Sequence, residues 1–456
     1  MSISQVRFMG PQLEKQKQLP APLIAFRGIR NPLVNDTVNF QGGSKATPVE
    51  GRREFNWDLR DLFLKIPKTE LHLHLSGSTP IPVIREILRE HGMKEDDVIK
   101  NTTFSTDYDG LDGFLKVYYK IAWVVKTPEH FKKSAYQICM DAAAENVKYL
   151  EIRTSCIDKD GTPDEILQAV TDGINKAKEE LKAKGFDQKA KIIVLAQRHH
   201  DPKEGLEHAK IAEKWSKKPD SLVVGFDVAG PESGFPITFH EESIRYAKNA
   251  GLKVTVHAGE TPSSKYVPSE KLKPIFGDKE IEVKPVEAIK KAIDYGADRL
   301  GHGVHLYDDP AVLKEVIDKQ IPIESPPKCN VQLGSVKSYK DHPIKKMLDD
   351  GVNVSLSTDN RALSGTNLHH EYEQLYVHDV VTSWTDIKKL VMNGVRSVFL
   401  PQEEKQQLVK QFEAELKAIE NDPKYKALID KYLTPTKKAI SFMGMKINKL
   451  LNNKAA

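Results

Sequence analysis

Short apolar runs alternate with longer amphipathic segments along most of the chain. Eight runs are rich in β-branched and apolar residues, and each is short enough to form a buried strand. The expected strands are 70–75, 149–154, 191–197, 222–229, 253–259, 298–304, 321–326 and 353–359. The segments between them, such as 162–185, begin with acidic residues and have helical spacing. This alternation predicts a parallel sheet whose strands are connected by helices.

Eight is the number of strands that closes a (β/α)₈ barrel, so we predict the TIM-barrel fold. The alternative is an open doubly wound sheet, but no glycine-rich phosphate loop follows the first expected strand. The long connection 76–148 contains several helical patterns and is expected to form a helical lid over the C-terminal mouth of the barrel. The proline-rich connection 261–285 is expected to be a surface loop, and 366–433 are expected to form extra C-terminal helices.

Three parts are expected along the chain. Residues 1–56 are rich in Gly, Pro, Asn and Gln and lack periodicity, which predicts an irregular N-terminal extension. Residues 57–433 are expected to form the barrel domain. Residues 434–456 contain five lysines and no acidic residue, and we expect this basic tail to be a solvated terminal helix.

Composition then narrows the classes of function. The 456 residues are 39% hydrophobic and 29% charged, which is ordinary for a globular protein. The formal net charge is +4, and the basic residues are scattered, so we expect neither nucleic acid nor a membrane as a partner. The three cysteines have no paired spacing, which favours a reducing compartment. With no signal-peptide pattern and no run of ~20 apolar residues, we expect a cytoplasmic protein.

Two histidines stand in the first expected strand, within TELHLHLSGS (69–78). Because side chains alternate along a strand, Glu70, His72, His74 and Ser76 should share one face, and the leucines the other. In a barrel, the leucines would meet the helices and the histidines would point inward. Two imidazoles placed in this way can bind one ion, although a hydrogen-bonded pair of core histidines explains this short motif equally well.

Polar residues also mark the ends of three later strands. His257 ends the fifth expected strand and Glu260 follows it, His302 lies in the sixth, and the eighth ends at Asp359, followed by Asn360. The C-terminal ends of barrel strands meet at one mouth, which is where active sites are assembled. Four strands that each place a histidine or a carboxylate there indicate a functional site rather than a chance arrangement.

The residue types predict a metal site. His72, His74 and His257 supply three nitrogen ligands, and Asp359 supplies one oxygen. This set suits Zn²⁺ with a position left for water. No lysine or cysteine on these strands is placed to bridge two ions, so we expect one Zn²⁺ per chain.

Two further residues are expected to act beside the metal. Glu260 comes three residues after His257, close to the metal without having to bind it, which suits a proton shuttle. The alternative for Glu260 is an acidic residue at the start of a helix. His302 can hydrogen-bond the attacking water and steer it. His305 has the opposite strand parity to His302, so we expect it to be structural.

With these residues, the chain resembles the adenosine deaminase family of amidohydrolase barrels. The resemblance extends from about residue 68 to about residue 412 and is carried by PKTELHLHLSGS, GFDVAG, VHAGE, RLGHGVH and LSTDN, in this order. The segment GFLKVYYKIAWVVKTPEHF also resembles the family's helical segment over the pocket. The resemblance implies hydrolytic, zinc-dependent removal of the 6-amino group of an aminopurine, most simply adenosine or deoxyadenosine, with release of ammonia.

The resemblance also implies a role for each site residue. The positions that match the zinc ligands are His72, His74, His257 and Asp359. Glu260 matches the acid that protonates the purine ring nitrogen, and His302 matches the histidine beside the attacking hydroxide. Gly230, at the end of GFDVAG, matches the glycine whose backbone N–H meets the purine.

Two positions depart from the family's adenosine pattern, which has an aspartate at each. Ser76 is shorter and uncharged where the pattern contacts the ribose side. Asn360 can still donate through its amide to the imidazole edge of a purine. We expect both to bind substrate, and Ser76 leaves open adenine, modified AMP or an aminofutalosine-like nucleoside. A deaminase-like extracellular or signalling ligand is the third interpretation, and the complete catalytic set argues against it.

Overall fold

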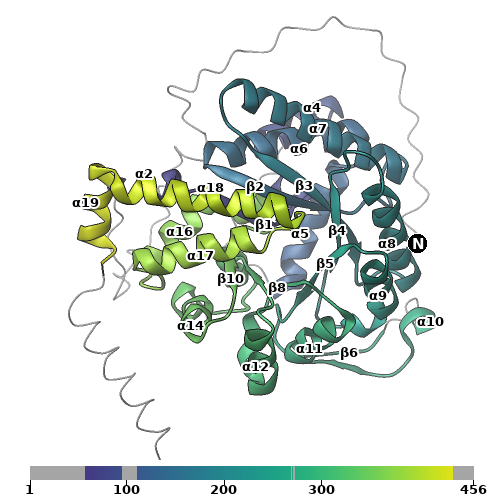
Figure 1. Ribbon diagram of the computed structural model, residues 1–456. Helices are drawn as coiled ribbons and strands as arrows, with labels where there is room; N and C mark the ends of the chain where they lie inside the picture. The colour runs from purple at the N-terminus through teal and green to yellow at the C-terminus, as the bar shows by residue number, and fades with distance from the viewer. Residues whose placement is uncertain (1–56, 95–109, 269, 271–272, 435–456) are drawn as a thin grey trace, which may run out of the picture. The chain divides into compact units, whose positions relative to one another are not determined.

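The computed structural model describes residues 57–94, 110–268, 270 and 273–434. Its main sheet consists of β1 (Lys68–His74), β2 (Val147–Thr154), β3 (Lys189–Gln197), β4 (Val223–Ala229), β5 (Lys253–Ala258), β8 (Arg299–His302), β9 (Ile323–Ser325) and β10 (Val354–Leu356). The strands are ordered β1-β2-β3-β4-β5-β8-β9-β10, and all neighbours are parallel (Figure 1). The predicted (β/α)₈ barrel is therefore confirmed, with small shifts in the strand bounds.

Backbone hydrogen bonds between the first and last strands close the barrel. The N–H of His74 donates to the carbonyl of Asp359 at 2.9 Å, and the N–H of Asp359 donates to the carbonyl of His72 at 2.8 Å. Leu73 and Asp359 thereby form a parallel bridge. Closure leaves no free sheet edge at this point, and it places residues from opposite ends of the barrel sequence side by side.

Helices connect the strands and cover the outside of the sheet (Figure 1). They are α2 (Trp57–Lys65), α6 (Pro128–Ala144), α7 (Pro163–Ala183), α8 (Pro202–Ser216), α9 (Glu241–Asn249), α11 (Pro285–Tyr295), α12 (Pro310–Asp318), α14 (Ile344–Asp350) and α17 (Trp384–Arg396). The start of α7 shows why acidic residues open these helices. Thr162 and Glu165 each accept the other's backbone N–H, and Pro163 occupies the first turn.

The two faces of β1 are divided as the alternation predicts. Leu71 and Leu73 are fully buried in the hydrophobic core outside the sheet. His72 points the other way, into the barrel, toward Glu324 of β9. The expected continuation of this face to Ser76 is wrong, because β1 ends at His74 and the chain turns into the short helix α3 (Leu75–Ser78). The backbone N–H of Thr79 donates to the carbonyl of Ser76, a hydrogen bond that a residue in an extended strand cannot accept from so near in the sequence.

The connection between β1 and β2 forms the expected helical lid. Its described helices are α3, α4 (Ile81–Glu90), α5 (Gly110–Val124) and α6. Helix α5 packs against α3 and α4 and lines the pocket with Leu111, Phe114, Leu115 and Tyr118. These positions follow the spacing i, i+3, i+4 and i+7, so they form one face of the helix. The lid therefore presents a mostly apolar surface to the pocket.

The connection after β5 is more ordered than its sequence indicates. The expected surface loop 261–285 contains an antiparallel pair, β6 (Ser264–Tyr266) and β7 (Ile281–Val283), and the helix α10 (Lys273–Phe276). Both strands lie in a proline-rich stretch outside the alternation of strands and helices that predicts the barrel, so the simple loop prediction is wrong here. The expected C-terminal helices are confirmed as α16 (Leu368–Val377), α17, α18 (Gln402–Asn421) and α19 (Pro423–Tyr432).

The ends of the chain remain predictions. The N-terminal extension 1–56 lies outside the described residues, as does nearly all of the basic tail 434–456. Among the helices that the structure describes, none combines the length and the apolar character needed to cross a membrane.

Candidate active site

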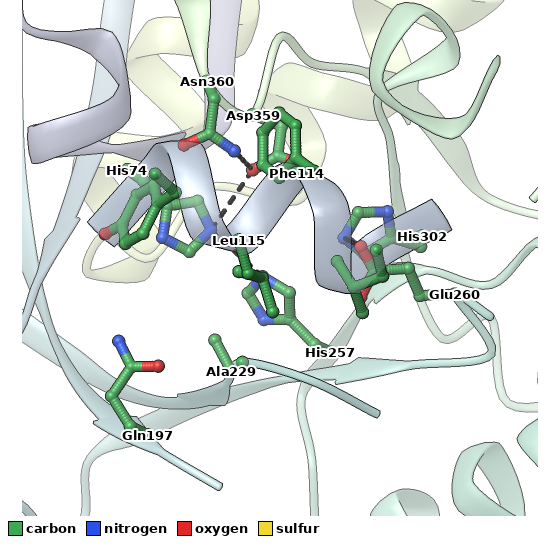
Figure 2. Close-up of a pocket in the computed structure, with 13 residues that line it drawn as sticks. His74, Phe114, Leu115, Gln197, Ala229, His257, Glu260, His302, Asp359 and Asn360 are labelled. Carbon is green, nitrogen blue, oxygen red and sulfur yellow. Dashed lines mark hydrogen bonds and ion pairs between the residues drawn. The ribbon is translucent and has the colours of Figure 1, made fainter. Parts of the chain in front are cut away.

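The C-terminal ends of β1, β3, β4, β5 and β8 and the segment after β10 meet around one pocket beneath α5 (Figure 2). Seven of the nine predicted site residues line it, namely His74, Gly230, His257, Glu260, His302, Asp359 and Asn360. His72 lies directly behind the lining, and the centroid of its ring is 4.5 Å from that of His257. Closure of the barrel therefore brings together residues that are far apart in the sequence.

The four predicted metal ligands converge on one point. Oδ1 of Asp359 lies 3.5 Å from Nε2 of His72 and 3.2 Å from Nε2 of His74. The Nε2 atoms of His74 and His257 are 3.1 Å apart. His72 Nε2 is buried and has no hydrogen-bond partner among the described residues. Three imidazole nitrogens and one carboxylate oxygen are a typical donor set for zinc, so the residues present fit this ion.

Two buried carboxylates orient two of the predicted ligand histidines. Glu324 on β9 accepts from Nδ1 of His72 at 2.8 Å, and Asp227 on β4 accepts from Nδ1 of His257 at 3.2 Å. Each bond leaves the Nε2 lone pair facing the cluster. Arg153 on β2 joins the two carboxylates, since it donates to Asp227 at 2.9 Å and to Glu324 at 2.7 Å. None of these three residues was among the predicted site residues. Arg153 and Glu324 lie inside strands without a motif of their own, and Asp227 lies within GFDVAG, where only Gly230 was given a role.

Burial keeps the histidines of the cluster neutral. Desolvation is the main cause that lowers the pKa of His72, His74 and His257 well below the usual range, and nearby cationic groups lower it further. The neutral imidazole is the form that binds a metal. Burial also raises the pKa of Asp359 to about 6. A cation among these groups would favour the ionised carboxylate instead.

Glu260 lies beside the cluster, in an irregular segment after β5. No helix starts there, so the interpretation of Glu260 as a helix-start acid is wrong. Its Oε1 is 3.5 Å from Nε2 of His302. Burial first, and then the carboxylates of Asp359 and Glu232, raise the pKa of Glu260 well above its usual value. This environment favours the acid form, which can donate a proton into the pocket.

A buried carboxylate that sequence analysis missed holds this segment in place. Glu232 accepts the backbone N–H groups of Gly259 at 2.9 Å, Glu260 at 2.7 Å and Thr261 at 3.0 Å. Gly259 has φ 72°, a conformation that glycine adopts without strain, and this turn lets three consecutive N–H groups converge. The only signal in the sequence is a carboxylate two residues after Gly230.

Gly230 and Asn360 form parts of the pocket wall. Gly230 has φ 99°, and a Cβ atom there would lie 2.8 Å from Oε1 of Gln197, so only glycine fits. Gly230 forms part of the pocket lining. Asn360 donates from Nδ2 to Oδ1 of Asp359 at 2.7 Å, which orients its amide beside the cluster.

Ser76 reaches the pocket only indirectly. It is buried in α3, beside Tyr118, which lines the pocket. The ring of Tyr118 stands edge-on to that of His74, with centroids 6.2 Å apart. The side of the pocket formed by Ser76 and Tyr118 therefore carries two uncharged hydroxyl groups.

Backbone strain coincides with the site. His302 and Asp359 both have φ 65°, a region that residues with a side chain seldom occupy and that is concentrated at functional positions. After His302 the chain turns into the 3₁₀ helix η3 (Val304–Asp308). His305 on η3 bonds to Asp308 at 3.0 Å and does not line the pocket, which agrees with a structural role.

A closed parallel barrel with this cluster and an acid at its C-terminal mouth defines a barrel hydrolase. A model of the family described as "Adenosine deaminase" matches residues 67–272 and 281–415. The chain belongs to the adenosine deaminase family and is a hydrolytic deaminase that acts on a C–N bond. The resemblance noted in the sequence is confirmed.

Individual relatives agree with this assignment. The chain is 32% identical to an adenosine deaminase of Clostridium perfringens, over 76% of this chain and 97% of the relative. It is 30% identical to an adenosine deaminase of Lactococcus lactis, over 79% and 96% of the two chains. Adenine deaminase from Arthrobacter aurescens shares the fold, with a TM-score of 0.62, 24% identity and coverage of 77% and 99%. Arabidopsis N6-mAMP deaminase does so with a TM-score of 0.64, 22% identity and coverage of 78% and 99%.

Proposed function

We propose that this enzyme hydrolyses the 6-amino group of adenosine or deoxyadenosine, with one Zn²⁺ per chain, and releases ammonia. The observation that carries the proposal is the convergence of a buried acid, Glu260, with three imidazoles and one carboxylate at a single pocket, of which His72 lies just behind the lining. The two curated relatives described above are adenosine deaminases, which supports the same substrate.

The chemistry of the pocket suits this reaction. A bound Zn²⁺ supplies a Lewis acid that lowers the pKa of a water molecule. The purine C6 is a poor electrophile, and Glu260 makes it more reactive by donating a proton to the adjacent ring nitrogen. Glu260 then takes a proton from the attacking water and passes it to the leaving amine. His302, whose Nε2 lies 3.5 Å from Oε1 of Glu260, orients the attacking oxygen.

The walls of the pocket suit a flat heterocycle. The apolar face of α5 covers one side, and the backbone of Gly230 and the amide of Asn360 offer polar contacts at the edges. A purine is flat: its two faces are apolar, and its hydrogen-bonding atoms lie only along its edge. We infer that Gly230 and Asn360 read this rim and that α5 covers the ring.

A neutral 5′-modified adenosine is the second candidate substrate. The observation that favours it is the pair of Ser76 and Tyr118, whose uncharged hydroxyl groups lie close together where the family's adenosine pattern has an aspartate. The lining residues that the structure describes include no lysine or arginine. A phosphate would lose its hydration without gaining a cation, so modified AMP is disfavoured.

A substrate panel tests the proposed function. The zinc-loaded chain is incubated with adenosine, 2′-deoxyadenosine, 5′-deoxyadenosine, adenine and AMP, and ultraviolet absorbance and ammonia are followed. We expect turnover of adenosine and 2′-deoxyadenosine. Turnover confined to 5′-deoxyadenosine would favour the second candidate, and no turnover of any 6-aminopurine would contradict both.

Removal of the metal is expected to abolish this activity. Without the ion, no group in the pocket can activate water to a comparable degree, so the rate should fall by at least about 10²-fold. The measurement is ammonia release before and after chelation, with zinc content determined in parallel. Re-addition of Zn²⁺ should restore the rate, whereas fully demetallated protein that keeps its activity would refute the metal's role.

Replacing Glu232 with Gln is expected to lower kcat about ten-fold, because an amide NH₂ would then face the converging backbone N–H groups and displace Glu260. The measurement is kcat and zinc content of Glu232→Gln. A matched control is Glu371→Gln, since Glu371 is also buried and accepts a backbone N–H, that of Lys328 at 3.2 Å, but does not line the pocket. Equal kcat in both variants would show that Glu232 does not position Glu260.

The proposed compartment is the cytoplasm. Cys139, Cys156 and Cys329 are all unpaired and buried. Free buried thiols without a disulfide are typical of a reducing environment, which supports this proposal.

A further inference from the structure

His302 is the end point of a hydrogen-bond chain that leads away from the pocket. Asn330 on α13 (Pro327–Gln332) places Nδ2 2.9 Å from Nδ1 of His302. Oδ1 of the same amide lies 3.1 Å from Nε2 of His342, and Nδ1 of His342 lies 3.2 Å from the backbone nitrogen of Ile344. All three side chains are buried, so the chain of contacts is shielded from water.

The direction of every hydrogen bond in this chain follows from its outer end. A backbone N–H can only donate, so Nδ1 of His342 accepts from Ile344, and its single proton must be on Nε2. Nε2 of His342 therefore donates to Oδ1 of Asn330. This orients the amide so that its NH₂ donates to Nδ1 of His302, which leaves the proton of His302 on Nε2.

The reverse arrangement is unfavourable. If the amide of Asn330 were turned round, its NH₂ would face the N–H of His342, and two buried donors would oppose each other. Burial also lowers the pKa of His342 to about 3, so this residue stays neutral and keeps its role at neutral pH. The direction of the chain is thus set by the backbone of Ile344.

We propose that Asn330 and His342 are positioning residues that hold His302 as the neutral tautomer protonated on Nε2. His302 then donates a hydrogen bond into the pocket and is not the base that takes a proton from water. Its Nε2 is buried, faces Glu260 and has no hydrogen-bond partner among the described residues, so this N–H is available for the attacking oxygen.

This inference rests on the proposed function, which identifies the attacking oxygen as the acceptor of this hydrogen bond. It also limits which groups can carry protons during the reaction. The attacking water loses two protons, and a donor at Nε2 of His302 can accept neither. Both are then carried by Glu260, one to the ring nitrogen beside C6 and one to the leaving amine, which departs as ammonia. The C6–N bond breaks and a C6–O bond forms, with no net gain or loss of protons by the enzyme.

The direct test is nitrogen NMR of the full zinc-loaded chain labelled with ¹⁵N-histidine. Long-range ¹H–¹⁵N couplings show which ring nitrogen carries the proton, and the His302 signals are identified by their loss in His302→Gln. We expect a protonated Nε2 and an unprotonated Nδ1 in His302 at neutral pH. A proton on Nδ1, alone or together with one on Nε2, would overturn the inference. This result does not depend on turnover, so it can fail or succeed separately from the proposed function.

Two substitutions at His342 test the positioning role. His342→Leu removes the donor to Asn330, so we expect mixed tautomers of His302 and about a ten-fold lower kcat with KM changed by less than about two-fold. His342→Gln keeps a side-chain N–H toward Asn330 and should recover most of kcat. Wild-type kcat and an unchanged tautomer in His342→Leu would overturn the role. If His342→Leu does not fold, the wild-type spectrum and His342→Gln still decide.

Discussion

Replacing Glu260 with Gln should lower kcat for adenosine by on the order of 10²-fold or more. The amide has nearly the same size as the carboxylic acid, but it can neither donate an acidic proton to the ring nitrogen nor pass one to the amine. Zinc content should stay at the wild-type level because Glu260 is not among the predicted ligands. The measurement is steady-state kinetics with metal analysis on the same preparation.

The stability of this variant separates chemistry from folding. Glu260 is buried, and the carboxylates of Asp359 and Glu232 raise its pKa, so the uncharged Gln should leave Tm equal to or above that of the wild type. Glu282→Gln, on the exposed side of β7, removes a carboxylate of the same type outside the pocket and should retain full activity. Retention of kcat within a few-fold in Glu260→Gln would remove Glu260 from the mechanism.

The largest effect on the fold is expected from Arg153→Met. Arg153 is fully buried and donates to Asp227 at 2.9 Å, to Glu324 at 2.7 Å and to the carbonyl of Leu71 at 2.7 Å. Without the guanidinium, the carboxylates of Asp227 and Glu324 stay buried in the barrel but lose a positive charge that balances them. Breaking a buried ion pair in this way costs about 3–5 kcal/mol of unfolding free energy.

Urea unfolding of Arg153→Met measures this loss, and metal titration should show about 10–100-fold weaker zinc binding, because Asp227 and Glu324 orient two of the ligand histidines. Arg245→Met is the matched control. Arg245 on α9 pairs with Glu241 at 2.7 Å, but its side chain is 48% exposed, so its loss should cost no more than about 1 kcal/mol. Equal losses in the two variants would show that the buried network does not stabilise the barrel.

Much of the fold is encoded locally. The alternation of leucine and histidine in 70–75 predicts both the strand and the direction of its side chains, because a strand has a period of two whatever surrounds it. The count of eight apolar runs predicts closure, since parallel strands connected by helices must be covered on both faces. The positions of His257, His302 and Asp359 at strand ends then predict a common mouth. β6 and β7 lie outside the alternation of strands and helices, in the proline-rich connection after β5, and the sequence pattern did not predict them.

Other features depend on contacts between distant segments. Ser76 leaves the strand because the chain turns into α3, and only the packing of α5 over α3 brings its hydroxyl to Tyr118. Glu232 has no pattern around it, yet it holds the backbone on which Glu260 depends. A side chain that accepts backbone N–H groups needs only the right position in space, so its neighbours in sequence carry no trace of this role.

The barrel and the inward histidines follow from the amino-acid sequence, which also predicts a metal site, because periodicity and strand ends are local properties of the chain. The control of the site depends on contacts that form only in the folded barrel. The orientation of His72 by Glu324 and the chain from Ile344 through His342 and Asn330 to His302 each join separate elements. Their donors and acceptors are assigned by distance and burial, which exist only once the barrel has closed.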